Sequence, residues 1–92
     1  MQDFTNKIKI FNELRVGSLI KLSNSEPIHL FSLPNGRFSD SIGMLESEDP
    51  VLLLEKKDMP PYHHNYWIRF LTKDGKILWS KLYSCDTWEV VL

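Results

Sequence analysis

Only one cysteine occurs among the 92 residues, so Cys85 has no partner for a disulfide within the chain. Small secreted domains usually depend on several disulfides, and their absence favours a reducing compartment. No stretch approaches the roughly 18 consecutive apolar residues of a membrane span, and residues 1–20 contain no apolar run of signal-peptide length. We therefore expect a cytoplasmic protein, or one in a particle assembled there, without membrane association.

The chain also lacks a basic excess, with eleven Lys and Arg against twelve Asp and Glu and a formal net charge of −1. Binding along a nucleic-acid backbone needs cations at the phosphates, so this balance disfavours duplex binding and leaves only a local patch. Catalytic motifs are missing too: there is no Gly-x-Ser-x-Gly, phosphate-binding loop, His-Glu-x-x-His or dinucleotide glycine pattern. We expect no enzyme activity and no cofactor.

The histidines do not suggest a metal site. His63 and His64 are adjacent, and adjacent residues of a strand point to opposite faces, so they do not readily chelate one ion. His29 and Cys85 lie far from them in the sequence. Cys85 has no neighbouring cation that would activate it as a nucleophile. We expect no bound metal.

The length and composition fit one globular domain with one core, at 42% hydrophobic and 25% charged residues. Turn-forming residues recur roughly every 8 to 15 positions and separate short apolar runs, a rhythm typical of β-sandwiches and barrels. The sequence therefore predicts an all-β fold. The expected strands cover residues 19–22, 27–31, 42–45, 51–54 and 87–92, in addition to a hairpin.

That β-hairpin, over residues 66–81, is the clearest predicted element. Its first arm alternates apolar residues on one face with a second face that carries Trp67 and Arg69. The pair Asp74-Gly75 then turns the chain, because glycine tolerates the positive φ that tight hairpin turns require.

The N-terminal residues 1–13 permit two interpretations. Ile8 and Ile10 alternate as in a strand, whereas Ile8 and Phe11 fit helical spacing. No segment sustains helical periodicity over ten residues with capping residues at its ends, so we favour an N-terminal arm or extra strand. The compact domain is then expected over residues 14–92.

Residues 67–80 read WIRFLTKDGKILWS and resemble the signature half of bacterial-type SH3 domains. Members of that superfamily pair a Trp-x-Lys/Arg-apolar strand with a turn such as Asp-Gly-Lys and a following Gly-Trp-apolar strand. Here Leu78 replaces the glycine and Ser80 the last apolar residue, which weakens any link to the family's ligand groove. A compact, strand-rich chain without an enzyme domain is also similar to small accessory proteins encoded by tailed phages.

The resemblance implies an SH3-like barrel of five to seven antiparallel strands, closed by the C-terminal strand. The superfamily hosts peptide-binding, cell-wall, nucleic-acid and architectural roles, so the fold alone assigns no function. The expected core consists of Leu19, Leu22, Ile28, Leu30, Leu45, Leu52, Leu54, Ile68, Phe70, Leu78 and Val90.

For the function we expect a non-catalytic protein–protein interaction module, acting as an adaptor, assembly component or inhibitor of a larger complex. Exposed Trp, Tyr and Arg are the usual anchors of protein interfaces, and rings with polar tips follow the two prolines at positions 60 and 61. The competing interpretation is a packed Trp pair covered by Lys and Arg side chains. The expected partner-binding residues are Tyr62, His63, Tyr66, Trp67, Arg69 and Trp79.

Two alternatives stay open. Residues 66–83 carry four cations against one carboxylate, and cations interleaved with aromatic rings are typical of single-stranded nucleic-acid binding. The cations are Arg69, Lys73, Lys76 and Lys81. The second alternative is a homo-oligomeric structural protein, in which residues 87–92 or 7–11 pair as an edge strand with another copy.

Overall fold

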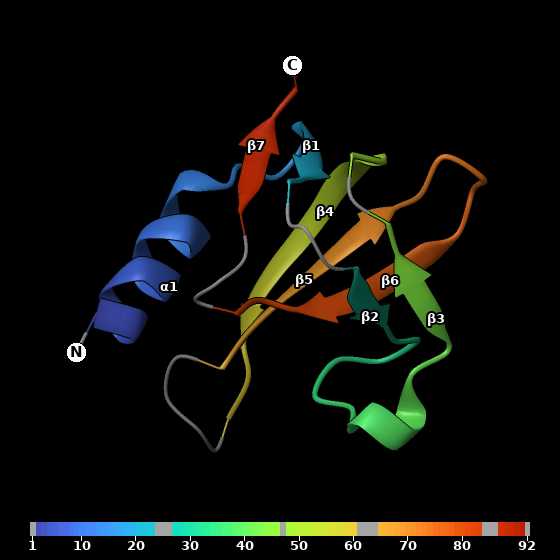
Figure 1. Cartoon of the computed structure of the whole chain (residues 1–92), viewed down its shortest axis with the longest axis horizontal. Coiled ribbons are helices and arrows are strands. Elements are labelled where there is room, and N and C mark those ends of the chain that lie inside the picture. Colours follow the sequence, from blue (N-terminus) through green and yellow to red (C-terminus); the bar gives the residue numbers. More distant parts are fainter. Residues whose placement is uncertain (1, 24–26, 47, 61–64, 84–86, 92) are drawn as a thin grey trace.

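The computed structural model describes residues 2–23, 27–46, 48–60, 65–83 and 87–91. Within these ranges the chain forms one α-helix, one 3-10 turn and seven β-strands (Figure 1). In chain order the elements are α1 (Gln2–Glu13), β1 (Leu19–Leu22), β2 (Ile28–Leu30), η1 (Phe38–Asp40), β3 (Gly43–Leu45), β4 (Pro50–Asp58), β5 (Tyr66–Leu71), β6 (Ile77–Lys81) and β7 (Trp88–Val90). The prediction of a mostly β protein is confirmed.

Two antiparallel sheets make up the β-structure, and they are joined at one point. The larger sheet has the strand order β6-β5-β4-β1-β7, and the smaller one pairs β2 with β3. Phe31, which follows β2, bridges to Trp79 of β6 through two N–H···O hydrogen bonds of 2.8 and 2.7 Å. The predicted barrel closed by the C-terminal strand is wrong. Among the described residues β7 pairs only with β1 and β3 only with β2, and each outer strand has only three residues with which to close a barrel.

The N-terminal segment is a helix, so the extra strand favoured for residues 1–13 is wrong and their helical interpretation is confirmed. The Phe11 ring stacks on Tyr66, with centroids 4.1 Å apart and an interplanar angle of 18°. Lys56 of β4 donates a hydrogen bond of 2.7 Å from Nζ to the Phe11 carbonyl oxygen near the end of the helix. Helices of this length gain most of their stability from such tertiary contacts, which a local pattern does not reveal. No helix in the described residues is long and apolar enough to span a bilayer.

The buried core has two parts, one on each face of the β5–β6 hairpin. Directly paired residues share a face of an antiparallel ladder, and the register pairs Trp67 with Lys81 and Arg69 with Trp79. These four side chains therefore share one face of the hairpin. On this face a smaller cluster joins Phe31, Trp67 and Trp79. The larger cluster consists of Leu14, Ile20, Leu22, Ile28, Leu30, Leu45, Val51, Leu53, Tyr66, Ile68, Phe70, Leu78 and Leu82.

The hairpin predicted over residues 66–81 is confirmed, and its turn is longer than a two-residue bend. The Thr72 N–H donates to the Lys76 carbonyl oxygen at 2.8 Å, and the Gly75 N–H donates to the Thr72 carbonyl oxygen at 3.0 Å. Gly75 has a φ of 87°, which a residue with a side chain rarely adopts. This pattern is the three-residue hairpin connection that ends in a glycine of positive φ.

Strand β4 differs from its predicted burial. Val51 and Leu53 are 1% and 0% exposed, whereas Leu52 and Leu54, which were expected in the core, are half-buried. Val51 lies opposite the buried Ile20 of β1 and Leu53 opposite the buried Phe70 of β5, so this register turns Val51 and Leu53 inward, and a β-bulge follows between Leu53 and Glu55. Val90 was also expected inside and is 55% exposed on the outer strand β7.

Candidate functional site

Three of the aromatic residues predicted to bind a partner are buried. Tyr66, Trp67 and Trp79 have exposed fractions of 6%, 1% and 7%. The Phe31 ring meets Trp67 nearly edge-on, with centroids 5.2 Å apart, and covers this face of the hairpin. Burial raises the pKa of Tyr66, and the negative charge of Asp58 raises it further. These rings therefore pack the interior, as the competing interpretation expected, and offer little surface to a partner.

A buried asparagine that the sequence did not single out organises this region. The Trp67 indole N–H donates to the Asn65 side-chain oxygen at 3.1 Å. The Asn65 amide nitrogen donates to the Asn35 side-chain oxygen at 2.9 Å and to the Met59 carbonyl oxygen at 3.3 Å, and its backbone N–H donates to Asp58. Because Asn65 is only 6% exposed, these bonds satisfy its polar atoms away from water.

Three of the four cations predicted to bind nucleic acid lie beside carboxylates. The pairs Arg69–Glu55, Lys73–Asp49 and Lys76–Asp74 have nitrogen–oxygen distances of 3.1, 3.2 and 3.9 Å. The Arg69 guanidinium also lies over the Trp79 ring, 5.8 Å from its centroid. The positive charge of this part of the hairpin is thus largely offset.

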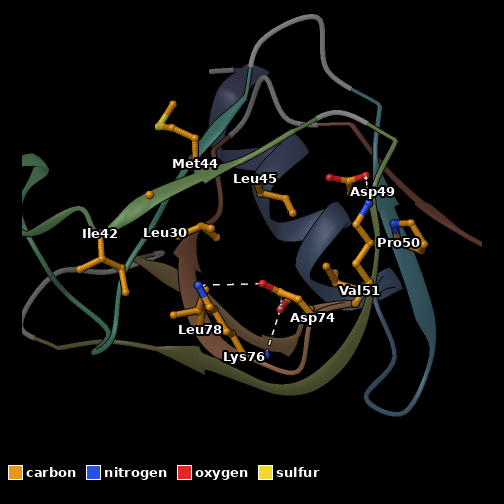
Figure 2. Close-up of a pocket in the computed structure, with 13 residues that line it drawn as sticks. Leu30, Ile42, Met44, Leu45, Asp49, Pro50, Val51, Asp74, Lys76 and Leu78 are labelled. Atoms are coloured by element: carbon orange, nitrogen blue, oxygen red, sulfur yellow. Dashed lines mark hydrogen bonds and ion pairs between the residues drawn. The ribbon is translucent and has the colours of Figure 1, made fainter.

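A pocket of about 360 Å³ lies between β3, the start of β4 and the turn of the β5–β6 hairpin (Figure 2). We call it the β3 pocket. Ile42 and Met44 lie at its outer edge, 58% and 43% exposed, and the Met44 side chain points away from the other lining side chains (Figure 2). No motif in the sequence marks this pocket, because its walls come from separate segments of the chain. Its apolar wall includes the buried residues Leu30, Leu45, Val51 and Leu78, and its polar rim consists of Asp49, Thr72, Lys73, Asp74 and Lys76.

The rim of the β3 pocket carries charges of both signs. The Lys73–Asp49 pair connects the hairpin turn with the start of β4, and its side chains are 69% and 36% exposed. An exposed pair of this kind contributes only about 0–1 kcal/mol, so a ligand can displace it. On the turn, the Thr72 hydroxyl donates to Asp74 and lowers the pKa of that carboxyl, which Lys76 and Lys73 lower further.

A second, shallower pocket of about 240 Å³ lies at the other end of the hairpin. We call it the Lys81 pocket. The Lys81 Nζ lies over the Tyr83 ring, 5.6 Å from its centroid. None of the ion pairs between described residues involves Lys81 or Arg37. The lining residues are Phe31, Gly36, Arg37, Trp67, Lys81 and Tyr83.

The histidines and the cysteine add no ligand cluster in the part of the chain that the structure describes. There, no three His, Cys, Asp or Glu side chains lie close enough together to hold a metal ion. His29 Nδ1 lies 2.9 Å from the Ser41 hydroxyl oxygen. The predicted partner-binding residues Tyr62 and His63, together with His64 and Cys85, lie outside the described residues.

Comparison of the chain with protein-family models, with curated proteins and with solved structures finds no match in any of the three. A functional assignment therefore rests on the chemistry of the two pockets.

Proposed function

We propose that this chain is a non-catalytic protein-interaction module that takes an extended apolar segment of a partner protein into the β3 pocket. The observation that supports this proposal is that the pocket lies beside the open edge of β3. Within the described residues β3 pairs only with β2, and Gly43, Met44 and Leu45 all line the pocket. An adaptor, an assembly component or an inhibitor would each use such a site.

An edge strand and an apolar pocket together suit an extended peptide. The edge presents unpaired backbone N–H and C=O groups, and an added strand satisfies them while its alternate side chains point to one face. About 360 Å³ is near the lower end of the volumes of ligand sites, so the pocket suits one or two large side chains. Ile42 at the mouth would lose apolar exposure on binding, which favours association.

The polar rim limits the chemistry of the partner. Two lysines and two aspartates surround the mouth, so their charges cancel. A strongly acidic or strongly basic segment gains no net attraction there. The occupant is therefore an apolar segment with uncharged or mixed flanks.

We also infer that the scaffold is an open variant of the SH3-like architecture. The β5–β6 hairpin supports this inference, because it pairs two strands that carry the family's Trp positions around a glycine-containing turn. The departures from the family pattern have structural explanations in this chain. Leu78 is buried, and the Ser80 hydroxyl donates to the His29 carbonyl oxygen at 3.0 Å, which ties β6 to β2.

Selection from a displayed library of random peptides, about 12 residues long, on the immobilised full chain tests the proposal. The selected peptides should be rich in apolar residues at alternate positions. Titration calorimetry should then show binding weakened about tenfold or more by Ile42→Asp, because it places a charge at the apolar mouth.

Ile77→Asp is the matched control, since Ile77 is 54% exposed and does not line the pocket. Its affinity should stay within about twofold of the unmodified chain. Equal weakening by Ile77→Asp and Ile42→Asp, or a library that yields no peptide above background, would contradict the proposal. Urea unfolding of each variant establishes that it is folded before binding is compared.

A further inference from the structure

The four cations of the predicted nucleic-acid site fall into two groups with different surroundings. Arg69, Lys73 and Lys76 lie within ion-pair distance of carboxylates. Lys81 takes part in no ion pair between described residues and lies against an aromatic ring instead. An anion would displace an existing carboxylate from the first group, and meets no such competition at Lys81.

Arg37 also lines the Lys81 pocket and comes from a loop that hydrogen bonds hold in place. The Arg37 backbone N–H donates to the Asp40 carboxylate at 2.9 Å, and the Asp40 backbone N–H donates to the Arg37 carbonyl oxygen at 2.8 Å. The neighbouring Gly36 packs so closely on Phe31 that an added Cβ would lie 2.8 Å from that ring. The guanidinium therefore extends from a fixed backbone, and like Lys81 it has no ion-pair partner in the described residues.

A third cation lies within electrostatic reach of this pocket. Burial lowers the pKa of Lys7 on α1, and the positive charge of Lys81 lowers it further, against the opposing effect of Asp58. Lys7 therefore adds positive potential near Lys81, which favours an anion bound there.

The aromatic rings give this basic site a second property. Tyr83 is half-buried, with Lys81 over its ring, and Phe31 and Trp67 also line the pocket. A planar group stacked on Tyr83 would bring an attached phosphate close to Lys81 and Arg37. A shallow pocket open to solvent also lets a polymer continue beyond it on either side.

We propose that the Lys81 pocket binds one nucleotide of a single-stranded nucleic acid, with its base on Tyr83 and its phosphate between Lys81 and Arg37. Stacking combined with phosphate contacts is the usual mode of sequence-tolerant single-strand binding. This goes beyond the proposed peptide site, which lies at the other end of the hairpin and shares no lining residue with this pocket.

Fluorescence anisotropy with labelled single-stranded DNA and RNA of about 12 nucleotides tests the proposal, with the full chain at about 50 and about 200 mM salt. Micromolar binding that weakens at the higher salt is expected. The double variant Arg37→Ala/Lys81→Ala should bind at least fivefold more weakly. The double variant Lys73→Ala/Lys76→Ala removes the same formal charge from cations that are ion-paired. Its affinity for the oligonucleotide should stay within about twofold of that of the unmodified chain at the higher salt.

Tyr83→Ala should weaken binding about fivefold or more, and Tyr83→Phe should preserve it, because only the alanine variant removes the stacking surface. Three outcomes would overturn the proposal: no binding at about 100 μM protein, equal losses in the two double variants, or equal affinities of Tyr83→Ala and Tyr83→Phe. Tighter binding of a phosphotyrosine peptide than of either oligonucleotide would also overturn it. Ile42→Asp, which disables the peptide site, should bind oligonucleotide normally, so the two proposals can fail separately.

Discussion

At the scale of single residues, buried polar groups explain why the aromatic rings of this hairpin face point inward. Asn65 and Ser80 are 6% and 1% exposed, and both have hydrogen-bond partners across strands or loops. Asn65 fixes the Trp67 indole from inside, and Ser80 ties β6 to the strand before Phe31. The aromatic rings are thus held inward by polar contacts that composition and strand alternation do not reveal.

We predict that Asn65→Ala lowers the free energy of unfolding by about 1–3 kcal/mol, because it leaves the Trp67 indole N–H without its acceptor in the interior. Urea unfolding followed by Trp fluorescence measures the change. Asn12→Ala, on the exposed side of α1, is the control and should change stability by less than about 0.5 kcal/mol. Equal stabilities of the two variants would mean that water replaces the lost acceptor.

Two glycines provide a second prediction at this scale. A Cβ at Gly36 would lie 2.8 Å from Phe31 Cδ2, whereas a Cβ at Gly43 would lie 3.9 Å from its nearest neighbour, Leu30 Cδ1. Gly36→Ala should therefore destabilise the protein by about 1–3 kcal/mol through overpacking. Gly43→Ala should be neutral or stabilising by up to about 1 kcal/mol, because it restricts the unfolded chain. Thermal unfolding of the pair tests the prediction, and a Gly36→Ala midpoint at or above that of Gly43→Ala would contradict it.

At the scale of elements, the sequence predicts best where an element carries its own signals. The hairpin has alternation in its first arm and a glycine of positive φ in its turn, so it is evident from residues 66–81 alone. The N-terminal helix has no such signal, because Ile8 alternates with Ile10 as in a strand and also fits helical spacing with Phe11. The helix depends instead on Tyr66 and Lys56, which are distant in sequence. Short amphipathic helices are decided by packing rather than by local propensity.

The uninterrupted apolar run of β4 shows the same limit. Residues 51–54 do not alternate, so the sequence gives no reason to place Val51 and Leu53 inside rather than Leu52 and Leu54. The register that decides the matter, with Val51 opposite Ile20 and Leu53 opposite Phe70, arises only when β4 pairs with β1 and β5.

The hairpin turn supplies the prediction that belongs to this scale. The Thr72 hydroxyl lowers the pKa of Asp74, so Asp74 stabilises the fold above the pKa of the unfolded chain, and this contribution is lost as pH falls through the lower folded pKa. Thr72→Val should raise the pKa of Asp74 toward its ordinary value, and Thr72→Ser should preserve the lowered value. An NMR titration of the Asp74 carboxyl carbon measures both.

The free energy of unfolding should depend on pH through the same shift in the pKa of Asp74. The difference in unfolding free energy between the unmodified chain and Thr72→Val should be constant above about pH 5 and shrink as pH falls below about 4. A remainder that does not depend on pH is expected, because Thr72 Oγ1 also accepts the Lys76 N–H at 3.1 Å. A difference that grows on acidification would show that the hydroxyl stabilises the protonated carboxyl instead.

At the scale of the whole molecule, the sequence predicts the fold class. It predicts neither whether the sheets close into a barrel nor where the pockets lie. Short strands and frequent turns indicate a mostly β protein, and nothing in residues 87–91 shows that β7 pairs with β1 alone. The β3 pocket joins side chains from β2, β3, β4 and the hairpin turn, so it exists only after the sheets have formed. The charge count of residues 66–83 was correct, but it could not reveal that Asp49 and Glu55 lie beside two of the cations.

The open edges bear on self-association. β7 is short, and Glu89 separates its apolar residues on the edge, with a side chain 54% exposed and 3.8 Å from Lys21. A charge on a short edge strand discourages pairing with another copy, since the added strand would bury it. We therefore expect the unmodified chain to be monomeric in solution, with a mass near 10.8 kDa.

Glu89→Val should reverse this behaviour, because it would continue the apolar edge into Val90 and Val91, which are already 55% and 41% exposed. Light scattering at about 100 μM protein should then detect dimers or larger species, while Glu13→Val, at the exposed end of α1, stays monomeric. A dimer of the unmodified chain would instead support the homo-oligomeric alternative.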